Sequence, residues 1–353
     1  MPHIPLKMIH LILTRYTFRV TLRRIINLAK IGISILLSKL LKKPVLSGNP
    51  ALLMVEPTNL CNLKCPMCPS GAGEMTRPRG QMKVEHFKKV LDQIGKDLIL
   101  IQFWNQGEPF IHTGLSEMVA YAKSKGIPAM TSTNGHFFQT PEQIESIVQS
   151  GIDEIIVSFD GIDQKTYEKY RVGGQFQKVI DGVKRLVQYK QNQKLKRPLI
   201  NLQFLVLKHN EDQMQQVESI GRRLGVDLVT MKSAQVYSDN QGREFLPDDE
   251  RFRRYTSDGK TYKIKSRFPN WCQFLWSGTV VNWDGSVTPC CFDKDGEYTA
   301  GNPFQGEITF KEIWKGKKLQ SFRKKILANR SNIPICMNCF EGMRQPYVYY
   351  KVL

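Results

Sequence analysis

Acidic residues are missing from the first fifty positions of this 353-residue chain. The same stretch contains nine Lys and Arg residues, which account for about half of the net charge of +19. Beyond this segment the basic charge is diffuse, and no zinc-finger, RNP or helix-turn-helix signature accompanies it. We therefore expect no nucleic-acid partner.

Long apolar runs are missing as well. Within residues 23–43, the longest uncharged run spans residues 31–38. A transmembrane helix needs about 20 predominantly apolar residues, so this segment is too short to cross a bilayer. The sequence also shows no cleavable secretory signal ahead of its cysteines.

Residues 22–40 nevertheless have the spacing of an amphipathic helix. The apolar face contains Leu22, Ile25, Ile26, Ala29, Ile33, Leu36, Leu37 and Leu40. The other face contains Arg23, Arg24, Asn27, Lys30, Ser34, Ser38 and Lys39. Two interpretations stay open. The helix lies on an anionic membrane surface, which would place the protein peripherally on the inner face, or it packs on the protein with its basic side in water.

Cysteines are absent after position 339, and the eight that are present occur in groups. They are Cys61, Cys65, Cys68, Cys272, Cys290, Cys291, Cys336 and Cys339. In a chain of this size, grouped cysteines indicate metal ligands in a reducing compartment rather than disulfides. The expected location is therefore cytoplasmic.

Short apolar runs alternate with helical stretches from residue 51 onward, as in parallel α/β proteins. The expected strands are 51–56, 97–104, 127–132, 153–158, 199–206 and 226–232. The expected helices are 84–94, 115–124, 141–150, 175–189 and 212–224. Six such units predict a partial (β/α)6 TIM-like barrel, in which chemistry gathers at the carboxyl ends of the strands.

The chain is longer than one hydrophobic core usually organises, so we expect a large domain and a smaller one. Residues 1–48 form the basic amphipathic segment and residues 49–235 the barrel. Residues 236–267 are charged and poor in aliphatic side chains, which predicts a linker or surface excursion. Residues 268–345 form a C-terminal cysteine-containing domain.

The stretch "EPTNLCNLKCPMCPSG" at 56–71 places three cysteines within eight positions, just after the first expected strand. Pro66 and Pro69 argue against three core thiols on one helical face and favour a loop. Zinc and iron–sulfur clusters normally take four protein ligands. Zinc would need a fourth residue, whereas a four-iron cluster on three thiolates leaves one iron for a non-protein ligand.

This stretch resembles the radical S-adenosylmethionine (SAM) superfamily, whose hallmark is a C-x-x-x-C-x-aromatic-C loop after the first strand of a partial (β/α)6 barrel. The resemblance implies that Cys61, Cys65 and Cys68 hold a 4Fe-4S cluster and that SAM supplies the missing ligand. Met67 stands where the family usually has an aromatic residue that packs on adenine.

Later strand ends extend the resemblance. "FWNQGEPF" is similar to the family's Gly-Gly-Glu-Pro segment, with Gly107, Glu108 and Pro109 retained. Glu108 would accept hydrogen bonds from the SAM ammonium group. "TSTNG" and "SFDG" follow the third and fourth strands. They offer hydroxyl, amide and carboxylate contacts for ribose and the methionine carboxylate from Ser132, Asn134, Ser158 and Asp160.

The C-terminal cysteines form a second group that contains a C-x-x-C motif, and four of them would complete a zinc ribbon. Their spacing, together with "DGSVTPC" and "GNPFQGEITFKEIW", resembles the SPASM and twitch extensions of radical SAM enzymes instead. The resemblance implies one auxiliary 4Fe-4S cluster ligated by Cys272, Cys290, Cys336 and Cys339. Cys291 could replace Cys290, although its more natural role is that of a core thiol.

The resemblance implies reductive cleavage of SAM to a 5'-deoxyadenosyl radical, which abstracts hydrogen from a substrate. The cysteine spacing is closest to the butirosin-pathway dehydrogenase type, which favours oxidation of a small-molecule alcohol or sugar with the auxiliary cluster as electron acceptor. A reductant such as flavodoxin or ferredoxin would supply electrons.

Other functions stay open. One is a SPASM-type peptide maturase, although residues 1–50 lack the strand-rich pattern of a peptide-recognition domain. Another is a non-catalytic iron–sulfur or zinc-binding protein. No catalytic acid or base stands out. Tyr237, Arg243 and Glu244 follow the last expected strand and are candidates by position only.

Overall fold

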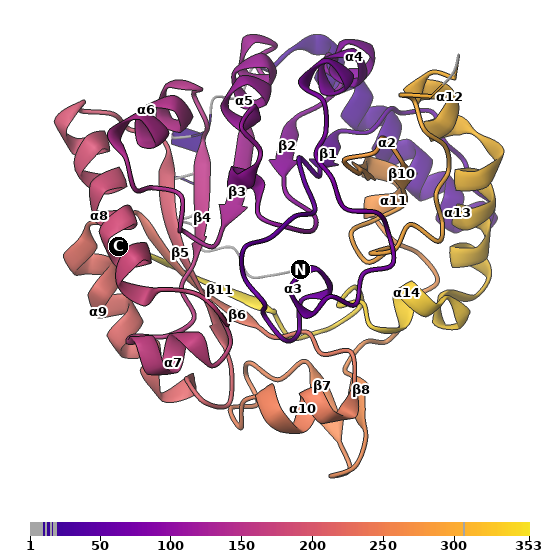
Figure 1. Ribbon diagram of the computed structural model, residues 1–353. Helices are drawn as coiled ribbons and strands as arrows, with labels where there is room; N and C mark the ends of the chain where they lie inside the picture. Colours follow the sequence, from indigo (N-terminus) through magenta and orange to yellow (C-terminus); the bar gives the residue numbers. More distant parts are fainter. Residues whose placement is uncertain (1–9, 11–12, 15, 17–19, 306–307) are drawn as a thin grey trace.

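A nine-stranded sheet forms the centre of the molecule in the computed structural model, which describes residues 10, 13–14, 16, 20–305 and 308–353. The order of the strands is β10-β9-β1-β2-β3-β4-β5-β6-β11. The six consecutive parallel strands are β1 (Leu52–Val55), β2 (Leu100–Phe103), β3 (Ala129–Thr133), β4 (Glu154–Ser158), β5 (Leu199–Val206) and β6 (Leu228–Ser233). The sheet curves into the expected partial barrel (Figure 1).

Helices cover the outer face of this sheet, and five of them match the predicted segments. They are α4 (Val84–Ile94), α5 (Leu115–Ser124), α6 (Pro141–Gln149), α8 (Phe176–Asn192) and α9 (Met214–Leu224). Each turns an apolar stripe toward the sheet; Phe87 of α4 and Val183 of α8 are buried with Phe103 and Ile155 in one core cluster. The apolar spacing read from the sequence thus corresponds to helix–sheet packing.

Further helices and turns connect these elements or follow them in the chain. They are α3 (Pro69–Ala72), η1 (Pro109–Ile111), α7 (Gln164–Glu168), η2 (Glu211–Gln213), α11 (Phe274–Ser277), α12 (Phe310–Lys315), α13 (Lys317–Asn329), η3 (Arg330–Asn332) and α14 (Pro334–Met337). No helix among the residues described is long and apolar enough to span a membrane.

Both edges of the barrel sheet are extended by strands from the C-terminal part of the chain. Strand β9 (Gly278–Val281) runs parallel to β1, and β10 (Val287–Thr288) pairs antiparallel with β9. Strand β11 (Val348–Val352) pairs antiparallel with β6. The sheet is therefore continuous across the expected boundaries at residues 235 and 268, and the chain after residue 345 belongs to it.

Residues 236–267, for which the sequence predicts a linker or surface excursion, contain regular secondary structure. They form α10 (Asp239–Phe245) and a hairpin of β7 (Tyr255–Ser257) and β8 (Tyr262–Ile264). Phe245 and Tyr255 are buried in an apolar cluster that also contains Cys65 and Met67. Phe245 and Tyr255 therefore pack the segment against the cysteine loop, although its composition is mostly charged.

The expected amphipathic helix is α2 (Leu22–Leu41), capped by the Thr21 side chain. Its packing differs from the interpretation in which the apolar face meets the protein. The buried residues are Arg24, Asn27, Ile31, Ser34 and Ser38, so the helix turns a mainly polar face inward.

Candidate radical and auxiliary cluster sites

The three cysteines of the first loop lie after β1 and share a pocket of about 160 Å³ with residues that follow β2, β3 and β4. Cys61, Cys65 and Cys68 line it on one side. From the neighbouring strand ends come Gly107, Glu108, Ser132, Asn134 and Ser158. The carboxyl ends of parallel strands meet at one edge of a sheet, which is why motifs far apart in sequence converge there.

Two glycines allow the backbone segments around this pocket to touch. Gly107 has a φ of +76°, and a Cβ there would lie 2.6 Å from the carbonyl oxygen of Leu60. A Cβ on Gly71 would lie 2.6 Å from the backbone nitrogen of Cys65. The Glu108 backbone N–H also donates to the Leu60 carbonyl at 2.7 Å. These contacts fix the loop after β2 against the cysteine loop.

Glu108 is buried and holds three hydrogen bonds. Its Oε2 accepts from the backbone N–H of Asn134 at 2.7 Å, and its Oε1 accepts from the Thr133 hydroxyl at 2.8 Å and the Phe110 N–H at 3.1 Å. Burial raises the pKa of Glu108 to about 7, although these donors act in the opposite direction. The carboxyl group is therefore poised to gain or lose its charge near neutral pH.

Three of the predicted SAM contacts do not line this pocket. Met67 is buried in the apolar cluster beneath the loop, and Pro109 begins η1. Asp160 is engaged by the protein itself: its Oδ2 accepts from Arg171 Nε at 2.5 Å and its Oδ1 from the Leu205 N–H at 2.7 Å. We infer that Asp160 orients the Arg171 side chain through this ion pair.

Arg171 is the main residue of this pocket that the sequence did not reveal. Its Nη1 lies 3.6 Å from the sulfur of Cys65 and can donate to it. Burial raises the pKa of the Cys65 thiol, and the charge of Arg171 opposes this rise. Thr133 and Asn62 were also missed, and Asn62 accepts from the Asn134 amide at 2.7 Å. Only the tertiary fold brings these side chains together.

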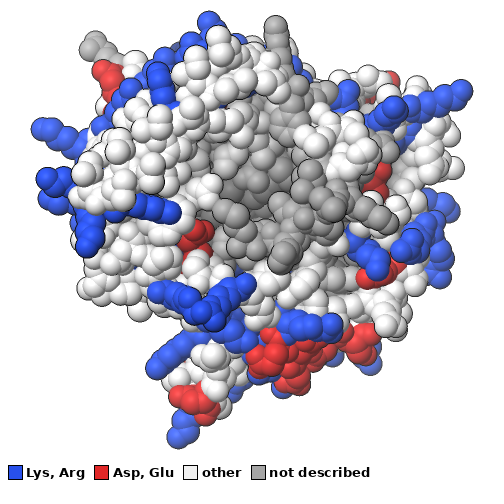
Figure 2. Space-filling view, turned by 180° about the vertical axis from the view of Figure 1, so that it is seen from behind, with Lys and Arg blue, Asp and Glu red and all other residues white. Residues whose placement is uncertain are grey.

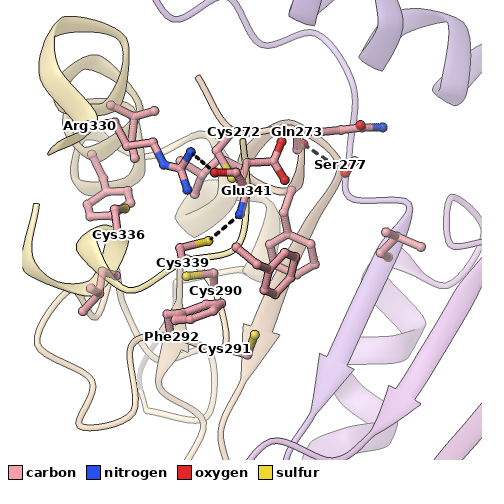
Figure 3. A pocket seen from close by; sticks show the side chains of 17 residues that line it. Cys272, Gln273, Ser277, Cys290, Cys291, Phe292, Arg330, Cys336, Cys339 and Glu341 are labelled. Carbon is pink, nitrogen blue, oxygen red and sulfur yellow. Dashed lines mark hydrogen bonds between the residues drawn. The ribbon is translucent and has the colours of Figure 1, made fainter. Parts of the chain in front are cut away.

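The second cysteine group lines a cavity of about 270 Å³ beside the edge strands. Cys272 precedes α11, Cys290 follows β10, Cys336 lies in α14 and Cys339 follows it. The Cys339 N–H donates to the Cys336 carbonyl at 3.1 Å, and the Cys339 sulfur accepts from the Glu341 N–H at 3.5 Å. Figure 3 shows Cys290 and Cys339 close together, whereas Cys291 points away from them.

The two sets of thiols suit iron–sulfur clusters by their chemistry. Among the side chains that the structure describes, no three from His, Cys, Asp or Glu stand close enough together to hold a metal ion. Burial raises the pKa of Cys61 to about 12, of Cys272 to about 11 and of Cys339 to about 12. Iron binds the thiolate, so cluster binding must release these protons and draw the sulfur atoms together.

Comparison with known protein families decides between the zinc and iron interpretations. A model of the radical SAM superfamily matches residues 55–218, and a model of the SPASM iron–sulfur cluster-binding domain matches residues 272–340. The chain contains a radical SAM domain followed by a SPASM domain. Radical SAM proteins are SAM-dependent enzymes, and SPASM domains bind auxiliary iron–sulfur clusters. The matches therefore support an enzyme with iron–sulfur clusters over a non-catalytic carrier or a zinc ribbon.

Individual proteins show how far the similarity extends. The tungsten-containing aldehyde ferredoxin oxidoreductase cofactor-modifying protein of Pyrococcus furiosus is 25% identical over 316 residues, or 81% of this chain and 86% of that protein. The structure of BtrN with AdoMet and 2-DOIA has a TM-score of 0.51 at 18% identity, covering 83% of this chain and 94% of BtrN. Streptococcus suis SuiB bound to precursor peptide SuiA has a TM-score of 0.59 at 15% identity, covering 87% of this chain and 73% of SuiB. The two structures support the fold alone.

Two lysines, Lys232 and Lys294, have pKa values shifted in opposite directions. Burial, followed by the charge of Arg254, lowers the pKa of Lys232 to about 8. Burial also acts to lower the pKa of Lys294, but the charges of Tyr237, Cys291 and Cys68 raise it overall. The Lys294 carbonyl accepts from Arg77 Nε at 2.7 Å, which joins the segment after Cys290 to the chain that follows the first cysteine loop. Cys291 is half-buried and lines the same cavity as the other four C-terminal cysteines.

Proposed function

We propose that this radical SAM enzyme oxidises an alcohol or sugar-like small molecule that carries an anionic group. The observation that carries the proposal is that the chain after Cys290 contacts the chain after the first cysteine loop: Arg77 Nε donates to the Lys294 carbonyl at 2.7 Å, and the Thr76 N–H donates to Asp295 Oδ1 at 2.7 Å. Cys61, Cys65 and Cys68 would hold the radical-site cluster. Cys272, Cys290, Cys336 and Cys339 would hold one auxiliary cluster, and a flavodoxin or ferredoxin would deliver the electrons.

When bound, SAM and the two clusters supply a hydrogen-abstracting 5'-deoxyadenosyl radical and an electron acceptor. The protein's own residues would bind and orient SAM and the substrate. Glu108 would hold the SAM ammonium, and Ser132, Asn134 and Ser158 would contact its ribose and carboxylate. Gly107 gives the backbone its close approach to the loop.

Lys232 and Lys294 would have different roles toward the substrate: Lys232 would accept a proton, and Lys294 would bind an anionic group. A lysine whose pKa is lowered to about 8 is substantially neutral at mildly alkaline pH, so Lys232 can accept the proton of the substrate hydroxyl. Lys294 stays charged and would bind an anionic substituent. Oxidation of the alcohol removes one hydrogen atom from carbon, one proton from oxygen and one electron, which leaves a carbonyl.

A peptide or a bulky cofactor precursor is the second candidate substrate. A pocket of about 500 Å³ opens beside Tyr237, between the β7–β8 hairpin and the residues Met337 and Asn338. It is large enough for a substrate that extends outward from the space between the two sites. The Pyrococcus relative, a cofactor-modifying protein, is consistent with such a substrate.

The test is anaerobic incubation of the reconstituted enzyme with SAM, reductant and a panel of anionic alcohols, sugars and peptides. Mass spectrometry would follow 5'-deoxyadenosine and the product. We expect the double variant Cys336→Ala/Cys339→Ala to keep SAM cleavage and lose the oxidised product, once its first cluster has been verified. Oxidised product at the normal yield would make the auxiliary site a structural element only.

A matched pair of variants tests the choice between the adjacent cysteines. Cys290→Ala should lower the iron content from about eight to about four per chain, since a four-iron auxiliary cluster is lost. Cys291→Ala should keep the full iron content. The reverse result would exchange the two assignments.

A further inference from the structure

Helix α2 exposes its apolar face instead of burying it. Six of its aliphatic side chains each have between 51% and 73% of their surface exposed: Leu22, Ile25, Ile33, Leu36, Leu40 and Leu41. Single exposed leucines are ordinary on protein surfaces, but a row of them along one helix marks an interaction surface. We call this row the α2 apolar face.

Directional hydrogen bonds fix the helix in this orientation. Arg24 donates to two backbone carbonyls that follow α5, at 2.7 and 3.2 Å. The Asn27 side chain donates to the Asn49 carbonyl at 3.1 Å and accepts from the Asn49 N–H at 2.8 Å. Ser38 accepts from the Trp276 indole at 3.0 Å. Rotating α2 to bury its leucines would strand these buried polar groups, at a large cost in stability.

The charged side chains that α2 itself contributes are all basic. The helix sequence contains no acidic residue, and Lys30, Lys42 and Lys43 are exposed along it or at its end. Arg23 is also half-exposed while it pairs with Asp97. Seen from behind, basic side chains gather around an uncharged area at the upper left, where α2 lies; a small acidic group lies at the upper-left margin, and the largest acidic group gathers at the lower edge (Figure 2).

We propose that the α2 apolar face docks on the surface of an anionic phospholipid bilayer. Leucine and isoleucine side chains would enter the boundary between headgroups and acyl chains, and the flanking lysines would contact lipid phosphates. A second copy of this chain fits less well, because pairing two such faces would bring their lysines together without any acidic side chain from α2 to balance them.

The position of α2 suits this orientation. The helix contacts Asp97 and the turn at 125–126, which precede β2 and β3. These contacts lie at the amino ends of the strands, whereas Glu108 and the cysteine loop lie at the carboxyl ends. A bilayer under α2 would therefore leave the radical SAM pocket facing solution, open to a dissolved substrate and reductant.

Vesicle sedimentation with the full-length, cluster-loaded protein tests the proposal. The vesicles contain equal parts of phosphatidylglycerol and phosphatidylcholine, with pure phosphatidylcholine for comparison. We expect Leu36→Gln to weaken binding about fivefold and Ile33→Gln/Leu36→Gln/Leu40→Gln about a hundredfold, because less apolar surface enters the bilayer and the three losses add as free energies. Leu195→Gln, an exposed leucine before β5, should change nothing.

Salt supplies an independent measurement. Raising the ionic strength from about 0.1 M to about 1 M shortens the Debye length from about 10 Å to about 3 Å, which should release much of the bound protein. Circular dichroism and iron content would verify that each variant is folded. The proposal is overturned if the triple variant binds vesicles as tightly as the wild type, or if the wild type binds neutral vesicles as tightly as anionic ones. It is also overturned if the wild type binds no vesicles but forms a dimer that the triple variant does not form.

Discussion

Glu108→Gln is the most direct test of the SAM pocket. The change keeps the size of a buried side chain and removes its charge. A hydrogen bond to a charged group contributes about 1.5–3 kcal/mol, so loss of the charge should weaken SAM binding about ten- to a hundredfold above neutral pH. Gln keeps only one of the two oxygens, so either the Asn134 N–H or the Phe110 N–H also loses its acceptor. The thermal midpoint and iron content must therefore be measured alongside affinity.

The pH dependence gives the sharper signature. Burial raises the pKa of Glu108 to about 7, so the carboxyl group is mostly ionised at pH 8 and mostly protonated at pH 6. Only the ionised form attracts the ammonium group. Between these two pH values the wild type should lose about tenfold in SAM affinity, as expected for one group with a midpoint between them. The affinity of Glu108→Gln should not change with pH.

The assay is anaerobic equilibrium dialysis of reconstituted protein against SAM. Glu154→Gln is the matched control, because Glu154 is also buried and begins strand β4 at the end remote from the SAM pocket. It accepts from the Asn201 amide at 2.8 Å. If Glu108→Gln binds SAM as tightly as the wild type, with the same pH profile, then Glu108 does not hold the ammonium and the pocket assignment fails.

Other outcomes follow from the same geometry. Cys65→Ala should abolish 5'-deoxyadenosine formation and keep the auxiliary iron; continued SAM cleavage would refute the loop assignment. Arg77→Met leaves the buried Glu56 without its bidentate partner at 2.8 and 3.0 Å, and should cost about 3–5 kcal/mol in denaturant unfolding, against no change if the pair is incidental. Lys232→Met should keep SAM binding and remove the rise in rate that the wild type shows as the pH increases through about 8, since only the neutral lysine accepts a proton; an unchanged profile would exclude Lys232 as the proton acceptor.

Much of the barrel could be predicted from the sequence because each of its strands and helices has a recognisable pattern within a short stretch of the chain. Each strand from β1 to β6 is a short apolar run between helices, and those runs can be recognised without tertiary contacts. The edge strands could not be predicted in this way. Strand β10 has two residues, too few for any periodicity, and the pairing of β11 with β6 joins residues more than a hundred positions apart.

The packing of α2 shows a second limit. Periodicity identifies which residues share a face, but it does not say which face is buried. Here the partners of the polar face come from distant segments, such as Trp276 and the backbone after α5. Site residues follow the same rule. Glu108 and the cysteines are carried by local motifs, whereas Arg171 acquires its role only through Asp160 and Cys65.

The continuity of the sheet has a consequence for handling this protein. Strand β9 covers one edge of β1, and β11 covers the outer edge of β6. A shortened chain that ends near residue 235 would present two bare strand edges, rich in Leu, Val and Met, to solvent. Such edges template intermolecular pairing. We expect the isolated barrel to aggregate on expression, so the C-terminal segment protects the solubility of the fold as well as carrying its cysteines.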